Sequence, residues 1–215
     1  MATLKRILLA DDHQIVLDGL CSLLAGEFEV CGTAMDGRQL VDLARKVQPD
    51  VIVTDISMPL LNGIDAVRKL REEGVTAKVV FLSMHFDVTY LSQALEAGAS
   101  AYVLKHAASD ELISAIRAAL RGGSFLSPQL RTPAVEELTD QTRRHAKSTI
   151  ELTPRQREVL QLLAEGKSAK AIGAILDISS RTVETHKYKM MDDLGVKSTA
   201  QLVQHAIKLG LVAPP

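Results

Sequence analysis

The sequence contains few aromatic residues and few cysteines, and it has no long apolar run. Aromatic residues make up 3% of the 215 positions and tryptophan is absent, so the core is expected to consist of Leu, Ile, Val and Ala. Cys21 and Cys31 lie in apolar segments without a metal-ligand spacing, which predicts two reduced core thiols. Only four apolar residues follow Lys5-Arg6, too few for a signal peptide, and no other run could span a bilayer. We therefore expect a cytoplasmic protein without membrane contact.

The overall net charge of −1 hides an asymmetry between the two halves. Residues 1–121 hold 12 Lys and Arg against 16 Asp and Glu, a net charge of −4, whereas residues 152–215 hold 9 against 6, a net charge of +3. A mildly basic C-terminal part is compatible with a nucleic-acid surface, although solvated basic faces are common. The two halves are expected to meet different partners.

Short apolar segments alternate with amphipathic stretches in the first half of the chain. The strand-like segments are Lys5–Ala10, Phe28–Ala34, Asp50–Thr54, Lys78–Leu82 and Ala101–Leu104. Continuous apolar runs fit strands that are buried on both faces of a parallel sheet. The alternation predicts an α/β domain over residues 1–121, with a five-stranded, doubly wound, flavodoxin-like sheet.

Charged residues directly follow three of these strands. Asp11 and Asp12 follow the first, Asp55 the third and Lys105 the fifth. Because ligands bind beyond the carboxyl ends of strands in open parallel sheets, these side chains are expected to converge. Clustered carboxylates repel one another and favour Mg²⁺, which prefers a few carboxylates together with water and phosphate oxygens. An Asp in such a site can attack phosphorus, while Lys105 neutralises the developing charge and the hydroxyl of Ser83 bonds a phosphoryl oxygen.

This set resembles the receiver domain of bacterial two-component response regulators over residues 4–121. The resemblance is strengthened by Met58-Pro59 and Gly63 after the third strand, and by the run Gly98-Ala99-Ser100-Ala101-Tyr102-Val103-Leu104-Lys105. It implies that Asp55 is the phosphoacceptor and that Ser83 and Lys105 contact the phosphoryl group. It also implies that Mg²⁺ is bound by the side chains of Asp11, Asp12 and Asp55 and by the backbone carbonyl of Ser57.

The same resemblance implies a conformational switch. The hydroxyl of Ser83 is expected to move toward the phosphoryl group, and the ring of Tyr102 to turn inward behind it. An ordinary role for Tyr102 as a core aromatic is compatible with this switch, because one ring can serve both.

Residues 122–150 lack a clear hydrophobic period. Gly122-Gly123 ends the preceding helical pattern, and Pro128 and Pro133 follow among scattered charges. The stretch predicts a linker, with one short helix near Ala134–Leu138.

The remaining residues, 151–215, predict a small domain of four helices. Thr153, Pro154 and Gln156 form a capping-box pattern for the first helix, which Gly166 ends. Ser168 is expected to cap a second helix that ends near Leu176. Ser179 is expected to cap the third helix, which runs to about Leu194, and the fourth helix is expected at Thr199–Leu209. Two helices joined by a tight turn, the second of them long and basic, are typical of a helix-turn-helix unit.

This part resembles the LuxR-type helix-turn-helix domain, and both parts together resemble the NarL/FixJ class of transcriptional regulators. The motifs are Leu152-Thr153-Pro154-Arg155-Gln156-Arg157-Glu158-Val159-Leu160 and Ile178-Ser179-Ser180-Arg181-Thr182-Val183-Glu184-Thr185-His186. The resemblance implies that residues 180–194 enter the major groove of DNA. The base-facing positions are then Glu184, Thr185 and Tyr188, and the phosphate contacts are Arg181, Thr182, Lys187 and Lys189.

Glu184 allows two interpretations. Its carboxylate could accept a hydrogen bond from a cytosine amino group, or it could interact favourably with the N-terminus of its own helix. The sequence favours neither.

We interpret the chain as a phosphorylation-controlled transcription factor and not as an enzyme. Its expected partners are a sensor histidine kinase that phosphorylates Asp55, double-stranded DNA, RNA polymerase, and a second copy of the chain after phosphorylation. A phosphatase of the haloacid dehalogenase type is disfavoured because Ser57 replaces the acid such enzymes need two residues after the nucleophile. A helix-turn-helix that binds protein or RNA instead of DNA stays open.

Overall fold

The structure is a computed structural model that describes residues 4–84, 88–130 and 152–212. The chain divides into two compact units, residues 1–146 and 147–215. The short helix expected near Ala134–Leu138 lies outside the described residues. Within the described part, no helix is long and apolar enough to cross a membrane.

The first unit is built on a parallel sheet of six strands, in the order β2-β1-β3-β4-β5-β6. The strands are β1 (Arg6–Ala10), β2 (Glu29–Ala34), β3 (Val51–Asp55), β4 (Lys78–Ser83), β5 (Ala101–Leu104) and β6 (Phe125–Leu126). The prediction of a doubly wound parallel sheet is confirmed, and the prediction of five strands is one too few. The sixth strand has two residues, too few to leave a hydrophobic period. It pairs with β5 beyond the position where we expected the domain to end.

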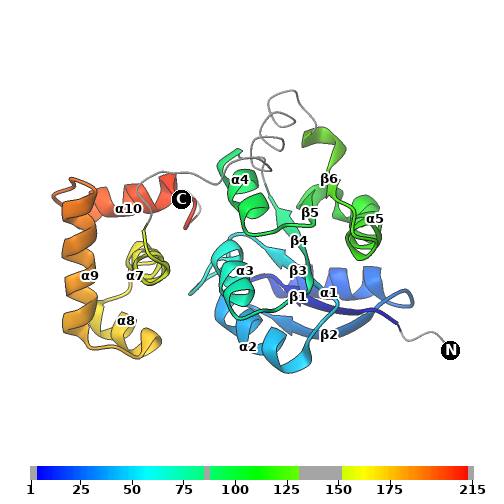
Figure 1. Ribbon diagram of the computed structural model, residues 1–215, viewed down its shortest axis with the longest axis horizontal. Coiled ribbons are helices and arrows are strands. Elements are labelled where there is room, and N and C mark those ends of the chain that lie inside the picture. The colour runs from blue at the N-terminus through cyan, green and yellow to red at the C-terminus, as the bar shows by residue number, and fades with distance from the viewer. Residues whose placement is uncertain (1–3, 85–87, 131–151, 213–215) are drawn as a thin grey trace. The chain divides into compact units, whose positions relative to one another are not determined.

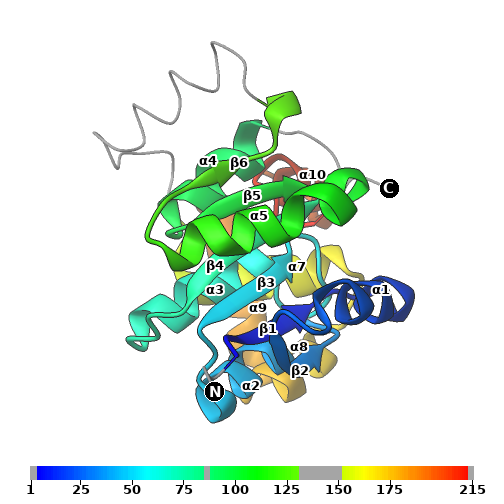
Figure 2. The same ribbon diagram turned by 90° about the vertical axis from the view of Figure 1, so that its right-hand side faces the viewer.

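Helices cover both faces of the sheet (Figures 1 and 2). One face carries α1 (Gln14–Leu24) and α5 (Ala108–Leu120), and the other carries α2 (Gly37–Val47), α3 (Gly63–Glu72) and α4 (Val88–Glu96). Successive strand residues point to opposite faces, so each strand supplies both helix layers. In β1, for example, Ile7 packs toward α1 and α5 whereas Leu8 packs toward α2, α3 and α4. Both residues are fully buried, which explains why the strands are continuously apolar.

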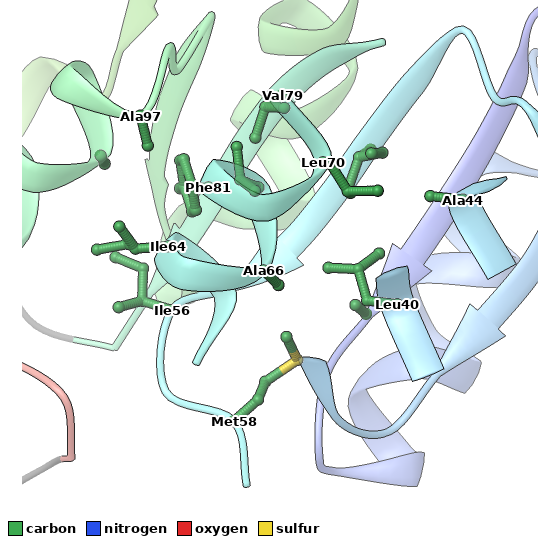
Figure 3. Close-up of a cluster of buried hydrophobic side chains, with 14 of the residues drawn as sticks. Leu40, Ala44, Ile56, Met58, Ile64, Ala66, Leu70, Val79, Phe81 and Ala97 are labelled. Atoms are coloured by element: carbon green, nitrogen blue, oxygen red, sulfur yellow. The ribbon is translucent and has the colours of Figure 1, made fainter. Parts of the chain in front are cut away.

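Each face of the sheet has its own hydrophobic core, and the larger one, between the sheet and α2, α3 and α4, also fixes the loop that follows β3. Ile56 and Met58 are buried, and Figure 3 shows both side chains directed into the cluster that contains Ile64 of α3 and Leu40 of α2. The intervening Ser57 stays half-buried at the carboxyl end of the sheet. Alternate apolar residues therefore hold this loop in place beside Asp55.

Gly63 lets α3 begin directly against the end of β3. A Cβ atom at this position would lie 1.9 Å from the backbone oxygen of Asp55, which no side chain allows. The backbone N–H of Gly63 donates to the oxygen of Ile56 at 2.8 Å. This close approach explains why the sequence places glycine eight residues after Asp55.

The described residues of the second unit, 152–212, form four helices, as predicted. They are α7 (Pro154–Ala164), α8 (Ala169–Leu176), α9 (Ser180–Asp193) and α10 (Thr199–Lys208). The capping box of Thr153 and Gln156 is present, and Ser168 and Ser179 cap α8 and α9. The helix α9 packs on α7 and α8, and α10 packs on α7 (Figure 1).

The turn between α8 and α9 is tight. Asp177 adopts a left-handed conformation with φ 54°, and the N–H of Ile178 donates to the oxygen of Gly173 at 3.0 Å. A Cβ atom at Gly173 would lie 2.6 Å from the oxygen of Ile178, so the turn requires glycine there. The helix-turn-helix geometry predicted from the sequence therefore depends on the close approach at Gly173 and on the Ser179 cap of α9.

Candidate functional site

The predicted acidic pocket forms at the carboxyl ends of β1, β3 and β5. The ammonium nitrogen of Lys105 lies 2.6 Å from Asp11 Oδ2 and 2.9 Å from Asp55 Oδ2. The side chain of Lys105 is only 8% exposed, and Asp11 is fully buried. The structure thus brings together three residues that are separated by up to 94 positions in the sequence. One buried cation is shared by two buried carboxylates.

The pKa of Asp55 is raised to about 6, mainly by burial and in addition by the neighbouring charge of Asp11, although Lys105 and the backbone N–H of Ile56 act in the opposite direction. The N–H of Ile56 donates to Asp55 Oδ1 at 2.7 Å. Asp55 therefore has one oxygen fixed by the backbone and one facing Lys105. At neutral pH most of the carboxyl is ionised, which is the form that acts as a nucleophile.

Lys105 stays charged in this environment. Burial disfavours its ammonium form, but the charges of Asp55 and Asp11 outweigh burial and raise its pKa above the usual value. A charged Lys105 can neutralise negative charge that develops at an oxygen near Asp55.

His13 was missed by sequence reasoning, although it contacts both neighbouring acids. Its backbone N–H donates to Asp11 Oδ1 at 3.0 Å, and its Nδ1 lies 2.8 Å from Asp12 Oδ1. Its position directly after two acids at a strand end was the available signal. His13 holds the two carboxylates at the mouth of the pocket.

The oxygen atoms of the pocket fit a hard divalent cation. Asp11 Oδ2 and Asp12 Oδ1 are buried, and each has one nitrogen neighbour, Lys105 Nζ at 2.6 Å and His13 Nδ1 at 2.8 Å. Buried carboxylate oxygens with unused lone pairs are the donors that Mg²⁺ accepts in proteins. Asp11, Asp12 and His13 also present ligand atoms within 4.8 Å of one another. Asp55 and Ser57 lie at the adjoining strand end, as the sequence predicts.

The structure places Ser83 on β4, beside β3, and Tyr102 on β5, the next strand in the sheet. Asp55 is paired in register with Leu82, and Ser83 with Leu104, so Ser83 lies next to both Asp55 and Lys105 at the sheet edge. Ser83 is 6% exposed and Tyr102 is 1% exposed. The ring of Tyr102 belongs to the larger core, which agrees with the packing role expected for it.

The helix α9 exposes most of the residues predicted to contact DNA. Arg181, Thr182, Thr185, Tyr188 and Lys189 are exposed, whereas Glu184 and Lys187 are half-buried. Tyr188 is 63% exposed, so its ring is accessible to a partner. On the opposite side of α9, Val183 and Met190 are fully buried. One face of α9 is therefore fixed to the unit and the other presents polar and basic groups.

The structure excludes one of the two interpretations of Glu184. No acidic residue lies in the first turn of α9, because Glu184 is the fifth residue of the helix. The interpretation that Glu184 interacts with the helix N-terminus is therefore wrong. Its carboxylate instead lies 2.5 Å from Lys187 Nζ, which is itself 4.9 Å from the ring centroid of Tyr188. Glu184, Lys187 and Tyr188 form one linked cluster on α9.

Comparison with known proteins gives matches to both units. Residues 7–117 match the response regulator receiver domain, and residues 151–206 match the family of bacterial regulatory proteins called luxR. The transcriptional regulatory protein MctR of Rhizobium johnstonii is 39% identical over 97% of this chain and 95% of its own length. The oxygen regulatory protein NreC of Staphylococcus carnosus is 37% identical over 96% of this chain and 99% of its own.

Solved structures are similar over nearly the whole chain. The RcsB response regulator of Salmonella typhimurium is 26% identical, with a TM-score of 0.63, and the match covers 97% of this chain and 99% of that one. A complex of the two-component response regulator RcsB with DNA is 28% identical, with a TM-score of 0.55, over 94% of this chain and 98% of that one.

The first unit is doubly wound and has an acidic pocket that contains a lysine, and a helix-turn-helix unit follows it. This combination defines a two-domain DNA-binding regulator. The chain belongs to the response regulators of two-component systems, in the NarL/FixJ class. It is a transcription factor and not an enzyme. Receiver domains of this family typically bind Mg²⁺ at the acidic pocket.

Proposed function

We propose that Asp55 is the residue through which this regulator receives its signal. The observation that carries the proposal is the position of Lys105 Nζ, within 2.9 Å of both Asp11 Oδ2 and Asp55 Oδ2. A cation at this point counterbalances the carboxylates before phosphorylation and can bind a phosphoryl oxygen afterwards. The phosphodonor is a phosphohistidine of a sensor histidine kinase.

The transfer follows from the chemistry of Asp55. An ionised oxygen of Asp55 attacks phosphorus, the bond from phosphorus to the donor imidazole breaks, and the imidazole leaves with a proton from water. Lys105 and the hydroxyl of Ser83 bind two of the phosphoryl oxygens. The backbone N–H of Ile56 keeps the other Asp55 oxygen in place, since it donates to Oδ1 at 2.7 Å.

The pocket would hold Mg²⁺ through the side chains of Asp11, Asp12 and Asp55 and the backbone carbonyl of Ser57. When bound, the ion supplies positive charge that offsets the charge of the carboxylates and of the incoming phosphoryl group. The clustering of buried oxygens from Asp11 and Asp12 supports this assignment.

Phosphorylation would act through Ser83 and Tyr102. We propose that the Ser83 hydroxyl moves toward the phosphoryl group and that the packing of the Tyr102 ring stabilises the resulting conformation of β5. The buried position of both residues on adjacent strands supports a concerted movement.

The proposed output is DNA binding by the exposed face of α9. Glu184, Thr185 and Tyr188 would face the bases, and phosphate contacts would come from Arg181, Thr182, Lys187 and Lys189. We assign this activity to residues 151–215, and residues between Leu130 and 151 connect it to the receiver domain.

A dimer of phosphorylated chains is the proposed DNA-binding form. RcsB, a similar protein, has been solved as two dimers bound to two parallel DNAs, which supports this assignment. In this chain, Val203 and Ile207 of α10 and the following Leu209 are half-buried, while Leu202 and Ala206 are buried in the unit. We further propose that the regulator acts in the cytoplasm, where its DNA lies, and contacts RNA polymerase there.

The proposal is tested with the full chain, acetyl phosphate and Mg²⁺. Intact mass should rise by one phosphoryl group in the wild-type protein and remain unchanged in Asp55→Ala. Affinity for a duplex recovered by selection against the phosphorylated protein is measured in parallel. Phosphorylation of Asp55→Ala, or DNA affinity that does not respond to phosphorylation of the wild type, would contradict the proposal.

A further inference from the structure

Ser127 is a fully buried residue that the phosphorylation chemistry above does not use. It lies just after β6 and is 0% exposed. Its hydroxyl donates to the carboxylate of Glu111 on α5 and accepts from the backbone N–H of Leu104 at 3.0 Å. Its own backbone N–H donates to the oxygen of Tyr102 at 3.1 Å. One small side chain therefore joins β5, α5 and the segment that follows β6.

These bonds lie at the point where β5 ends and Lys105 begins. Leu104 is the last residue of β5, and it precedes a short 3₁₀ turn, η1 (Lys105–Ala107). The backbone of Leu104 thus sets the direction in which Lys105 leaves the sheet toward Asp55. On this side of β5 the partner strand β6 has only two residues, so the strand itself does not extend to Leu104. The Ser127 hydroxyl binds the backbone N–H of Leu104, beyond the last residue pair of the β5–β6 ladder.

We propose that Ser127, supported by Glu111, is a positioning residue for Lys105. The charge on Glu111 orients the Ser127 hydroxyl, so that its lone pair faces the N–H of Leu104. This fixes the strand end from which Lys105 reaches both carboxylates of the pocket. The inference rests on the proposed function, because it concerns the rate at which Asp55 accepts a phosphoryl group.

Ser127 also lies at the start of the segment that leads from the receiver domain to the DNA-binding unit in the sequence. Ser127 is followed by the 3₁₀ turn η2 (Pro128–Leu130), whose Leu130 is 2% exposed and packs in the same core as Tyr102. The chain then continues toward the DNA-binding unit. The residue that positions Lys105 thus also anchors the start of the connection between input and output.

The test compares Ser127→Ala with a matched control, Ser100→Ala. Ser100 lies at the opposite end of β5 and is half-buried, so its loss removes a similar hydroxyl far from Lys105. The rate of Asp55 phosphorylation is measured as a function of acetyl phosphate concentration in saturating Mg²⁺. Ser127→Ala should lower the maximal rate by about tenfold, because displacing a reacting group by a fraction of an ångström has effects of this size. The half-saturating phosphodonor concentration should change by less than about twofold, and Ser127→Thr should restore the rate by returning the hydroxyl.

A double-mutant cycle separates positioning from general destabilisation. In a Lys105→Ala background, Ser127→Ala should cause no further loss of rate, because the residue through which it acts is gone. Glu111→Ala, on the half-buried surface of α5, provides a second variant if Ser127→Ala does not fold, and it should slow the wild type by at least about threefold.

Three results would overturn the inference. Ser127→Ala, or Glu111→Ala in its place, could match Ser100→Ala, which would show that the bonds are irrelevant to the pocket. The loss could be as large in the Lys105→Ala background as in the wild type, which would show a structural role only. If the wild type itself gains no phosphoryl group at Asp55, the proposed function and this inference fail together.

Discussion

Lys105 reaches Asp55 across the end of an intervening strand. Lys105 follows β5 and Asp55 ends β3, with β4 between them in the sheet, yet Lys105 Nζ lies 2.9 Å from Asp55 Oδ2. The same nitrogen lies 2.6 Å from Asp11 Oδ2 at the end of β1. The pocket is therefore held together by a contact that spans four adjacent strands, and it depends on their relative positions.

Removal of the shared cation should destabilise the receiver domain. In Lys105→Ala two buried carboxylates lose their common partner, and breaking a buried ion pair in this way costs about 3–5 kcal/mol. Urea unfolding at pH 7.5 without Mg²⁺ should therefore show a large loss for Lys105→Ala and almost none for the exposed control Lys46→Ala. Equal stability of the two variants would mean that Lys105 does not hold the pocket together.

Replacement of Asp55 by its neutral isostere should stabilise the protein at neutral pH. Folding raises the pKa of Asp55 from 3.8 to about 6, so the native state favours the protonated form. The associated stability is complete below about pH 4 and is lost as pH rises through about 6, by up to about 3 kcal/mol. Asp55→Asn should thus match the wild type near pH 4 and exceed it above pH 7. Unfolding midpoints with EDTA across this range measure the difference, and a constant difference with pH would contradict it.

Magnesium should stabilise the protein through Asp12. An ion that binds only the native state at about 100 times its Kd raises the free energy of unfolding by about 2.7 kcal/mol. Thermal unfolding should show this gain in the wild type and in the control Asp18→Asn, whose carboxylate is exposed on α1. The gain should be mostly lost in Asp12→Asn. If Asp12→Asn responds to Mg²⁺ as strongly as Asp18→Asn, Asp12 is not a ligand.

The pocket could be predicted from the sequence because each residue stands directly after a strand. Asp11, Asp55 and Lys105 follow apolar runs, and the rule for parallel sheets brings such positions to one edge. The roles of Ser57, Ser83 and Tyr102 needed the resemblance to a family, because one serine after a strand carries no chemistry of its own. The helix caps of the second unit could also be predicted from the sequence, because each cap depends only on residues within one helical turn.

What the sequence did not reveal depends on tertiary contacts. The strand β6 is too short for a period, and the three bonds of Ser127 join segments separated by up to 25 positions. The pairing of Glu184 with Lys187 and the position of Lys187 near the ring of Tyr188 depend on side-chain conformations, which the correctly predicted helix start does not determine.

Substitutions on α9 should separate phosphate contacts from base contacts. Lys189→Ala should weaken binding to all duplexes similarly and reduce the slope of log K against log salt by about 1. Glu184→Ala should change the preference at one base pair, by about 1–3 kcal/mol between the best and the wrong base. Fluorescence anisotropy with a duplex library at several salt concentrations measures both. Asp192→Asn, at the far end of α9, is the control, and a Glu184→Ala effect that is uniform across sequences would contradict base readout.

The most direct test of the account is the DNA affinity of the full chain in its two phosphorylation states. A selected duplex is titrated at fixed salt and Mg²⁺ with wild type and Asp55→Asn, each before and after treatment with acetyl phosphate. The account predicts that treatment tightens binding by the wild type about tenfold or more, a coupling of about 1.4 kcal/mol, and leaves Asp55→Asn unchanged. Equal affinity of phosphorylated and unphosphorylated wild type, or tightening in Asp55→Asn, would contradict it.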